Sequence, residues 1–189
     1  MRQLQFEITL VAGTALLFLA TILLNELLFT HLEFAPGINM IYLPAGVRLL
    51  SVLLFAEAGA IGLLLASWGI CFFYMFPDDP LRSFIGGILS ALAPYLAYRA
   101  LLASGVGASL RGMSGQRLFC FALLFSVMSP ALHHVWFALT GGQDLWHGFM
   151  IMFIGDLAGT LIVLYSARLV LRVFWPKPAI RQKQFLYRK

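Results

Sequence analysis

The chain has 189 residues, of which 61% are apolar and only 11% are Asp, Glu, Lys or Arg, whereas a soluble domain carries roughly 25% charged residues. So few charges cannot cover a water-exposed surface, which excludes a soluble enzyme and a nucleic-acid-binding domain. The net charge of +5 does not favour nucleic acid either, because most Lys and Arg residues lie beside apolar segments, where they mark membrane topology. We therefore expect an all-α, polytopic transmembrane helical bundle in a lipid bilayer, since helices satisfy their own backbone hydrogen bonds there.

Six apolar segments reach or approach the length needed to cross a hydrocarbon core of about 30 Å, and each is predicted to be a span. The first follows Arg2 as the core of a signal peptide would, but its length and the lack of a small-x-small cleavage site predict a retained anchor. The second and third are joined only near Glu57, which predicts a tight helical hairpin whose first arm is short, tilted or re-entrant. The spans cover about 8–28, 41–56, 58–76, 83–104, 118–138 and 148–172.

The distribution of Lys and Arg predicts the orientation of these spans. Basic residues gather between the fourth and fifth spans and after the sixth, whereas the alternate connections are acidic or neutral. Six spans then place both termini in the cytoplasm. Residues 1–172 are the expected bundle, and residues 173–189 are a basic and aromatic cytoplasmic tail that is expected to lie on anionic headgroups or to dock a partner. The cytoplasmic basic residues are Arg99, Arg111, Arg117, Arg168, Arg172, Lys177, Arg181, Lys183, Arg188 and Lys189.

Arg48 and Asp156 are ionisable residues inside predicted spans. A charge at the centre of a membrane helix costs about 2.5–3.5 kcal/mol even on the lenient insertion scale, so such residues usually face the bundle interior and have a partner. Both lie roughly 10–12 Å below the outer surface, counted at 1.5 Å per residue. We therefore predict a buried ion pair between Arg48 and Asp156 that joins the second and sixth spans, either as a structural clamp or as a ligand-coordinating pair.

Small residues at helical spacing predict close helix contacts. Gly155 and Gly159 bracket Asp156, and Gly59 and Gly62 follow the predicted hairpin turn. This pattern is common in membrane helices, and it indicates a contact without saying whether the partner helix belongs to the same chain.

The remaining chemically active side chains form no catalytic or metal-binding motif, so we expect no enzyme activity, no metal and no cofactor. Convergence of three or four histidines would suit zinc, nickel or copper, but HxxxH and CxxC spacings are absent from the sequence. Ser129 and His133 lack a carboxylate placed to orient the imidazole. Cys71 and Cys120 are about 20 Å apart in depth and are expected to be free thiols. The histidines fall on the predicted outer side, beside Trp136 and Trp146, and are His31, His133, His134 and His147.

Two stretches resemble a known family. Residues 39–50, Asn-Met-Ile-Tyr-Leu-Pro-Ala-Gly-Val-Arg-Leu-Leu, resemble the aromatic-x-Pro-x-Gly entry to a helix in the bacterial membrane-associated sensor domains that precede diguanylate cyclase and histidine kinase modules. Residues 155–159, Gly-Asp-Leu-Ala-Gly, resemble that family's later Asp-x-x-Gly helix. The resemblance implies a sensory inner-membrane bundle and adds weight to Tyr42, Pro44, Gly46, Asp156 and Gly159. Those domains usually have more spans than the six expected here. An output module also follows them, whereas only a short tail is expected here after the last span.

Three functions remain. The first is a ligand-binding or sensory module of the bacterial inner membrane without its own output domain, whose pocket lies between the outer halves of the second, fifth and sixth spans and takes a small anionic ligand. The second is an accessory or assembly subunit that binds partner membrane proteins. The third is a transporter subunit, because the six-span plan is similar to that of the substrate-binding subunits of energy-coupling-factor vitamin transporters, although the first span lacks their Ala-xxx-Ala pattern. The predicted ligand-binding residues are Tyr42, Arg48, His134, Trp136 and Asp156.

Overall fold

The computed structural model describes residues 2–36, 38–105, 110 and 112–174, and within them the chain is helical apart from one short hairpin. A 3-10 turn, Thr30–Leu32, follows the first helix, and a π-helical turn, Cys71–Met75, extends the second. Arg111 and residues 175–189 of the predicted tail lie outside the described residues. The elements are α1 (Arg2–Phe29), β1 (Glu33–Ala35), β2 (Ile38–Asn39), α2 (Leu43–Ile70), α3 (Pro80–Ala103), α4 (Gly115–Leu139) and α5 (Leu145–Phe174).

All five helices are long and apolar enough to cross a membrane. The shortest, α3, has 24 residues and measures about 36 Å, which exceeds a hydrocarbon core of about 30 Å. The outward faces carry large apolar side chains such as Leu27, Phe73 and Leu139, whereas polar side chains such as Ser126 and Thr160 are buried. A soluble protein does not leave so many large apolar side chains exposed, and the chain is a multi-pass membrane protein.

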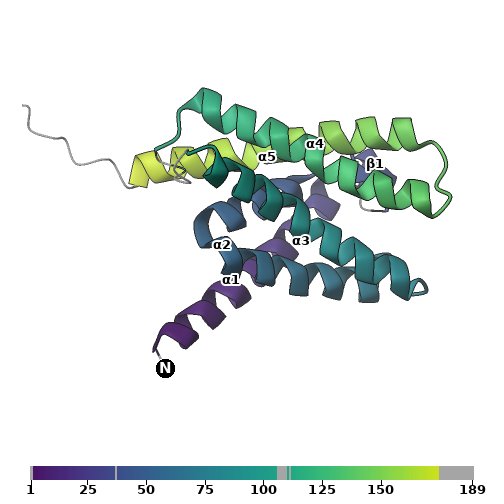
Figure 1. Cartoon of the computed structure of the whole chain (residues 1–189), viewed down its shortest axis with the longest axis horizontal. Coiled ribbons are helices and arrows are strands. Elements are labelled where there is room, and N and C mark those ends of the chain that lie inside the picture. The colour runs from purple at the N-terminus through teal and green to yellow at the C-terminus, as the bar shows by residue number, and fades with distance from the viewer. Residues whose placement is uncertain (1, 37, 106–109, 111, 175–189) are drawn as a thin grey trace, which may run out of the picture.

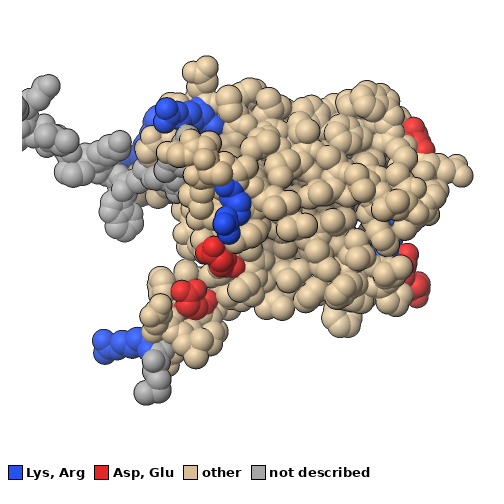
Figure 2. All heavy atoms as spheres, viewed as in Figure 1, with Lys and Arg blue, Asp and Glu red and all other residues tan. Residues whose placement is uncertain are grey.

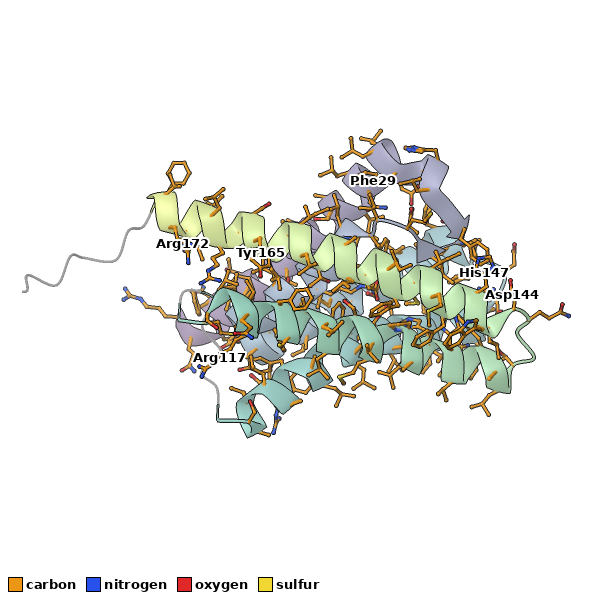
Figure 3. All side chains as sticks on the ribbon, turned by 90° about the horizontal axis from the view of Figure 1, so that it is seen from above. Phe29, Arg117, Asp144, His147, Tyr165 and Arg172 are labelled. Atoms are coloured by element: carbon orange, nitrogen blue, oxygen red, sulfur yellow. The ribbon has the colours of Figure 1, made fainter. Side chains whose placement is uncertain are left out.

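The helices run along the long axis of the molecule, and their connections lie at its two ends (Figure 1). The loop end carries β1 and β2, the turn between α2 and α3, and the loop between α4 and α5. The terminal end carries residue 2 and residue 174. Carboxylates stand out at the loop end, whereas Lys and Arg side chains gather, beside other carboxylates, at the terminal end (Figure 2). Figure 3 places Asp144 and His147 at the loop end and Arg117, Tyr165 and Arg172 at the terminal end.

α2 folds back on itself at Ala56, whose backbone is not helical, with φ 47° and ψ −120°. A Cβ atom on Gly59 would overlap the carbonyl oxygen of Ser51, although eight residues of straight helix span about 12 Å. The predicted second and third spans are therefore the two arms of one interrupted helix, and the structure has five helices rather than six. The first arm, residues 43–55, measures roughly 20 Å, which is shorter than a hydrocarbon core.

Replacement of Ala56 by glycine is expected to stabilise the protein by about 1 kcal/mol. The φ and ψ angles of Ala56 match the first central position of a type II′ turn, which glycine adopts without the strain that a Cβ atom imposes. Thermal unfolding in detergent measures the effect, and Ala60→Gly is the matched control. Ala60 lies in regular helix, where glycine costs about 1 kcal/mol, so the two variants should shift the unfolding temperature in opposite directions. A lower unfolding temperature for Ala56→Gly would show that the backbone does not turn at this residue.

The start of α2 is held between α1 and α5. The side-chain oxygen of Asn25 in α1 accepts a hydrogen bond from the backbone N–H of Leu43 at 2.9 Å, and the backbone N–H of Tyr42 donates to the carbonyl of Gly155 at 3.1 Å. Gly155 and Gly159 of α5 approach so closely that a Cβ atom on either would overlap a carbonyl oxygen, that of Asn39 and of Tyr42 respectively. The backbone of residues 39–43 is thus fixed on both sides.

The other small residues also lie at close contacts within the chain. A Cβ atom on Gly62 would lie 2.6 Å from the carbonyl oxygen of Val11, so the second arm of α2 meets α1 there. A Cβ atom on Gly46 would lie 2.7 Å from the carbonyl oxygen of Gly159, so the first arm meets α5. The glycines predicted from the small-residue pattern therefore let backbones of this chain approach each other.

Candidate functional site

A cavity of about 60 Å³ lies among α2, α3, α4 and α5, toward the loop end of the bundle. Each of these helices contributes side chains to its wall, and the connection between β1 and β2 closes one side. Its polar or sulfur-bearing lining residues are Tyr42, Arg48, Cys71, Met75, Arg82, Ser90, His133, Trp136 and Met152. We call this space the buried cavity.

Arg48 is a buried cation at the wall of this cavity, with only 6% of its surface exposed. Its Nη2 atom donates to the Tyr42 hydroxyl at 3.3 Å, and its guanidinium carbon lies 5.2 Å from the Tyr42 ring centre and 5.3 Å from that of Phe18. Its Nε atom has no hydrogen-bond partner in the described part of the chain. The contacts of Arg48 with α1 and α2 are therefore a hydroxyl and two aromatic faces, which attract a cation weakly but do not neutralise it.

The predicted direct ion pair between Arg48 and Asp156 is not formed. Within the described residues, the one ion pair closer than 4.0 Å joins Nδ1 of His147 to Oδ2 of Asp144 at 3.2 Å. Asp156 is buried, with 1% of its surface exposed, and interacts with Ser129 of α4, while Arg48 turns toward Tyr42 and Phe18. The two residues share a region of the bundle and influence each other electrostatically, but their side chains point to different helices.

Several buried polar atoms of α4 and α5 have no hydrogen-bond partner among the described residues. Oδ2 of Asp156, Oγ of Ser129 and Oγ1 of Thr160 are buried and make no hydrogen bond to the protein. Ser129 is near Asp156, but the geometry falls short of a hydrogen bond. An unsatisfied buried polar group costs about 1–3 kcal/mol, so a water molecule or a polar ligand group bound at these atoms would stabilise the bundle.

The neighbouring histidines point to different spaces. Nδ1 of His133 donates to the carbonyl of Ser129 at 2.9 Å, and Nδ1 of His134 donates to the carbonyl of Pro130 at 2.8 Å. Consecutive residues are about 100° apart around a helix, so only His133 lines the buried cavity. His134 lies elsewhere, between the rings of Phe137 and Phe149, which corrects its predicted place beside Arg48.

A second, wider space of about 400 Å³ opens at the loop end, and we call it the loop-end hollow. Its wall includes Phe34, Asp79, His134 and Asp144. It also shares part of its lining with the buried cavity, so the two spaces are neighbours separated by a common set of side chains. The shared residues are Ile38, Arg82, Trp136 and Phe137.

The predicted site residues are thus only partly brought together. Tyr42, Arg48 and Trp136 line the buried cavity, His134 lines the loop-end hollow, and Asp156 lies outside the lining of both. The sequence-based site also lacked Arg82 and Ser90 of α3 and Cys71 at the end of α2, because the pocket was expected between the second, fifth and sixth spans only. Arg82 carried a signal in the sequence, since it is the only Lys or Arg in the connections assigned to the outer side.

The described side chains of the site are chiefly groups that can bind a ligand. Across the described ranges, no group of three or more His, Cys, Asp or Glu side chains is placed to hold a metal ion. Cys71 is buried and Cys120 exposed, and both are free, as expected. A guanidinium with unused N–H donors, beside a phenol and an imidazole, is suited to hold an anion.

Comparisons of the chain with protein-family models, with curated proteins and with solved structures found no match. The resemblance to membrane-associated sensor domains stays a prediction, and the residues of the site carry the functional conclusion on their own.

Proposed function

We propose that the protein is an integral ligand-binding or sensory module that holds a small anionic ligand between its membrane helices. The observation that carries this proposal is Arg48, a buried cation that lines a cavity and has no carboxylate within 4.0 Å among the described residues. A buried charge is costly unless it is paired, and the anion of a ligand would supply the missing partner. Arg48 would bind this anion, and the Tyr42 hydroxyl would position the guanidinium.

Binding of acetate tests this proposal. Acetate, added in place of chloride at constant ionic strength, is expected to raise the unfolding temperature of the purified protein, because a ligand at 100 times its Kd adds about 2.7 kcal/mol of stability. Acetamide has nearly the same shape without the charge and should have no such effect. The same acetate response in Arg48→Met as in the natural protein would contradict the proposal.

We also propose that the chain crosses the membrane six times and that both termini are cytoplasmic, in the inner membrane of a bacterium. The fold-back of α2 at Ala56 supports six crossings, because its two arms run in opposite directions within the bundle. The basic residues of the terminal end, including Arg99 and Arg117, support a cytoplasmic position for that end. The loop end, with both spaces of the site, would then face outward.

Cysteine labelling tests this orientation. In a Cys71→Ala/Cys120→Ser background, Asp144→Cys is expected to react with an impermeant maleimide added outside intact spheroplasts, whereas Ser114→Cys should react only after permeabilisation. Asp144 lies in the loop between α4 and α5, and Ser114 precedes α4 at the opposite end. The reverse pattern of labelling would place the termini outside.

One observation favours an accessory or assembly subunit as a second candidate. The N-terminal half of α1 extends away from the other helices (Figure 1), and the buried stripe of α1 begins only at Thr14. Gly13 has nothing within 4 Å of where its Cβ atom would lie, so another membrane helix could approach closely there. This candidate predicts that the chain leaves the membrane together with another polypeptide.

A further inference from the structure

We infer that Arg82 forms the neck between the loop-end hollow and the buried cavity, and that the ligand is an unbranched monocarboxylate that enters with its carboxylate first. In this binding mode the carboxylate reaches Arg48, the chain passes Arg82, and the remainder of the molecule occupies the hollow. This inference rests on the proposed function and deepens it, because it names the class of ligand and a residue that selects it.

The sizes of the two spaces require an elongated ligand. The buried cavity measures about 60 Å³ and the loop-end hollow about 400 Å³, whereas pockets for small molecules usually measure about 300–1,000 Å³. The buried cavity therefore accommodates only the charged end of a ligand, and the hollow is large enough for the rest. Because the two spaces share four of their lining residues, a ligand that fills both must pass between these four side chains.

Arg82 is placed to control that passage. It lies in the first turn of α3, where Oδ1 of Asp79 accepts a hydrogen bond from its backbone N–H at 2.9 Å and fixes the main chain. Its guanidinium carbon lies 4.0 Å from the ring centre of Phe76 and 5.8 Å from that of Phe137. These ring contacts hold the guanidinium, and its N–H groups donate no hydrogen bond to the described residues, so a passing carboxylate can bind them in transit.

The side chains that line the neck and the loop-end hollow determine which ligand chain fits behind the carboxylate. Trp136 and Phe137 form the apolar part of the neck, and Phe34 and Leu81 continue an apolar wall into the hollow. An unbranched aliphatic chain fits this path, since it buries apolar surface without widening the neck. Asp79 and Asp144 line the hollow together with Arg82, so a second carboxylate at the far end of the ligand would meet two carboxylates and one guanidinium, an excess of negative charge. The site therefore favours one carboxylate over two.

A matched set of water-soluble acids tests the inference on the purified, full-length protein. The probes are acetate, propanoate, butanoate and pentanoate, with 2,2-dimethylpropanoate as the branched isomer of pentanoate and pentanedioate as the dicarboxylate. Affinity is expected to rise about fourfold per methylene along the unbranched series. Pentanoate should bind at least about tenfold more tightly than its branched isomer and than pentanedioate, because the narrow neck and the acidic hollow reject these two.

Arg82→Ala is expected to keep pentanoate binding and to reduce the preference over the branched isomer to less than about threefold, because the neck is wider without the guanidinium. Trp136→Ala widens the same neck from α4 and provides a second variant if Arg82→Ala does not fold. Arg117→Ala removes an arginine at the terminal end and should leave the preference unchanged. The binding measured with Arg48→Met is subtracted from each measurement as background. This subtraction removes the contribution of acids that partition into the detergent.

The outcomes separate this inference from the proposed function. One outcome is that acetate binding depends on Arg48, but affinity does not rise along the series and the branched-chain preference is the same in the natural protein and Arg82→Ala. This outcome would overturn the inference that Arg82 forms a selective neck, and it would leave the proposed function standing. A lack of any Arg48-dependent carboxylate binding would overturn both.

Discussion

Gly159→Ala is expected to destabilise the protein by about 3 kcal/mol, near the upper end of the range for overpacking of a core. The new Cβ atom would overlap the carbonyl oxygen of Tyr42, and it would also lie 2.8 Å from the backbone nitrogen of Leu43. Both neighbours are backbone atoms, so no flexible side chain can move aside. α5 would separate from the start of α2, and the Tyr42 and Arg48 side chains would be displaced with it.

Gly69→Ala is the matched control for this prediction. Gly69 is also a helical glycine, but nothing lies within 4 Å of where its Cβ atom would be. Alanine there should be neutral or slightly stabilising, because it favours the helix by up to about 1 kcal/mol over glycine. Thermal unfolding in detergent and anion binding are measured for both variants. Equal unfolding temperatures for the two variants would show that α2 and α5 do not meet at Gly159.

Arg48→Met is expected to keep or raise the stability of the ligand-free protein while it abolishes anion binding. Methionine fills a similar volume, and it removes a buried charge for which the described residues supply no carboxylate within 4.0 Å. Had Arg48 and Asp156 formed the direct pair expected from the sequence, loss of the arginine would leave an uncompensated carboxylate and cost about 3–5 kcal/mol. The sign of the change in stability therefore distinguishes the two arrangements.

Two companion variants complete this measurement. Arg48→Lys keeps the positive charge but loses the planar fork of the guanidinium, so it should retain weak acetate binding. Tyr42→Phe removes the hydroxyl that accepts from Nη2 of Arg48, and binding should weaken by less than in Arg48→Met. If Arg48→Met unfolds more readily than the natural protein by several kcal/mol, Arg48 is held by a carboxylate after all.

The helical membrane class and the position of the reversal in α2 could be predicted from the sequence, because both follow from local composition. The length of the apolar segments predicted the membrane helices. The short polar interruption at Glu57 lies next to Ala56, where the backbone turns. The small residues also pointed to real contacts, since Gly155 and Gly159 lie against the backbone of residues 39–43. Each of these features depends on residues within one or two helical turns.

The arrangement around Arg48 could not be predicted in the same way. Depth along a helix can be counted from the sequence, and that count placed Arg48 and Asp156 at one level. The direction of each side chain around its helix depends on which helices are neighbours, which the sequence alone does not provide. Arg48 turned toward Tyr42, Asp156 turned toward Ser129, and Arg82 entered the site from a helix that was expected to lie elsewhere.

Native mass spectrometry of the protein and of Arg48→Met, extracted side by side from their membranes in mild detergent, tests the central claim most directly. The natural protein is expected to carry one small acidic molecule that Arg48→Met lacks, since the buried guanidinium is the group that holds it. Fragmentation of the released molecule would also show whether it is a monocarboxylate. Two results would contradict an anion site at Arg48. In one, the natural protein carries no such molecule and co-purifies with another polypeptide; in the other, both forms retain the molecule equally.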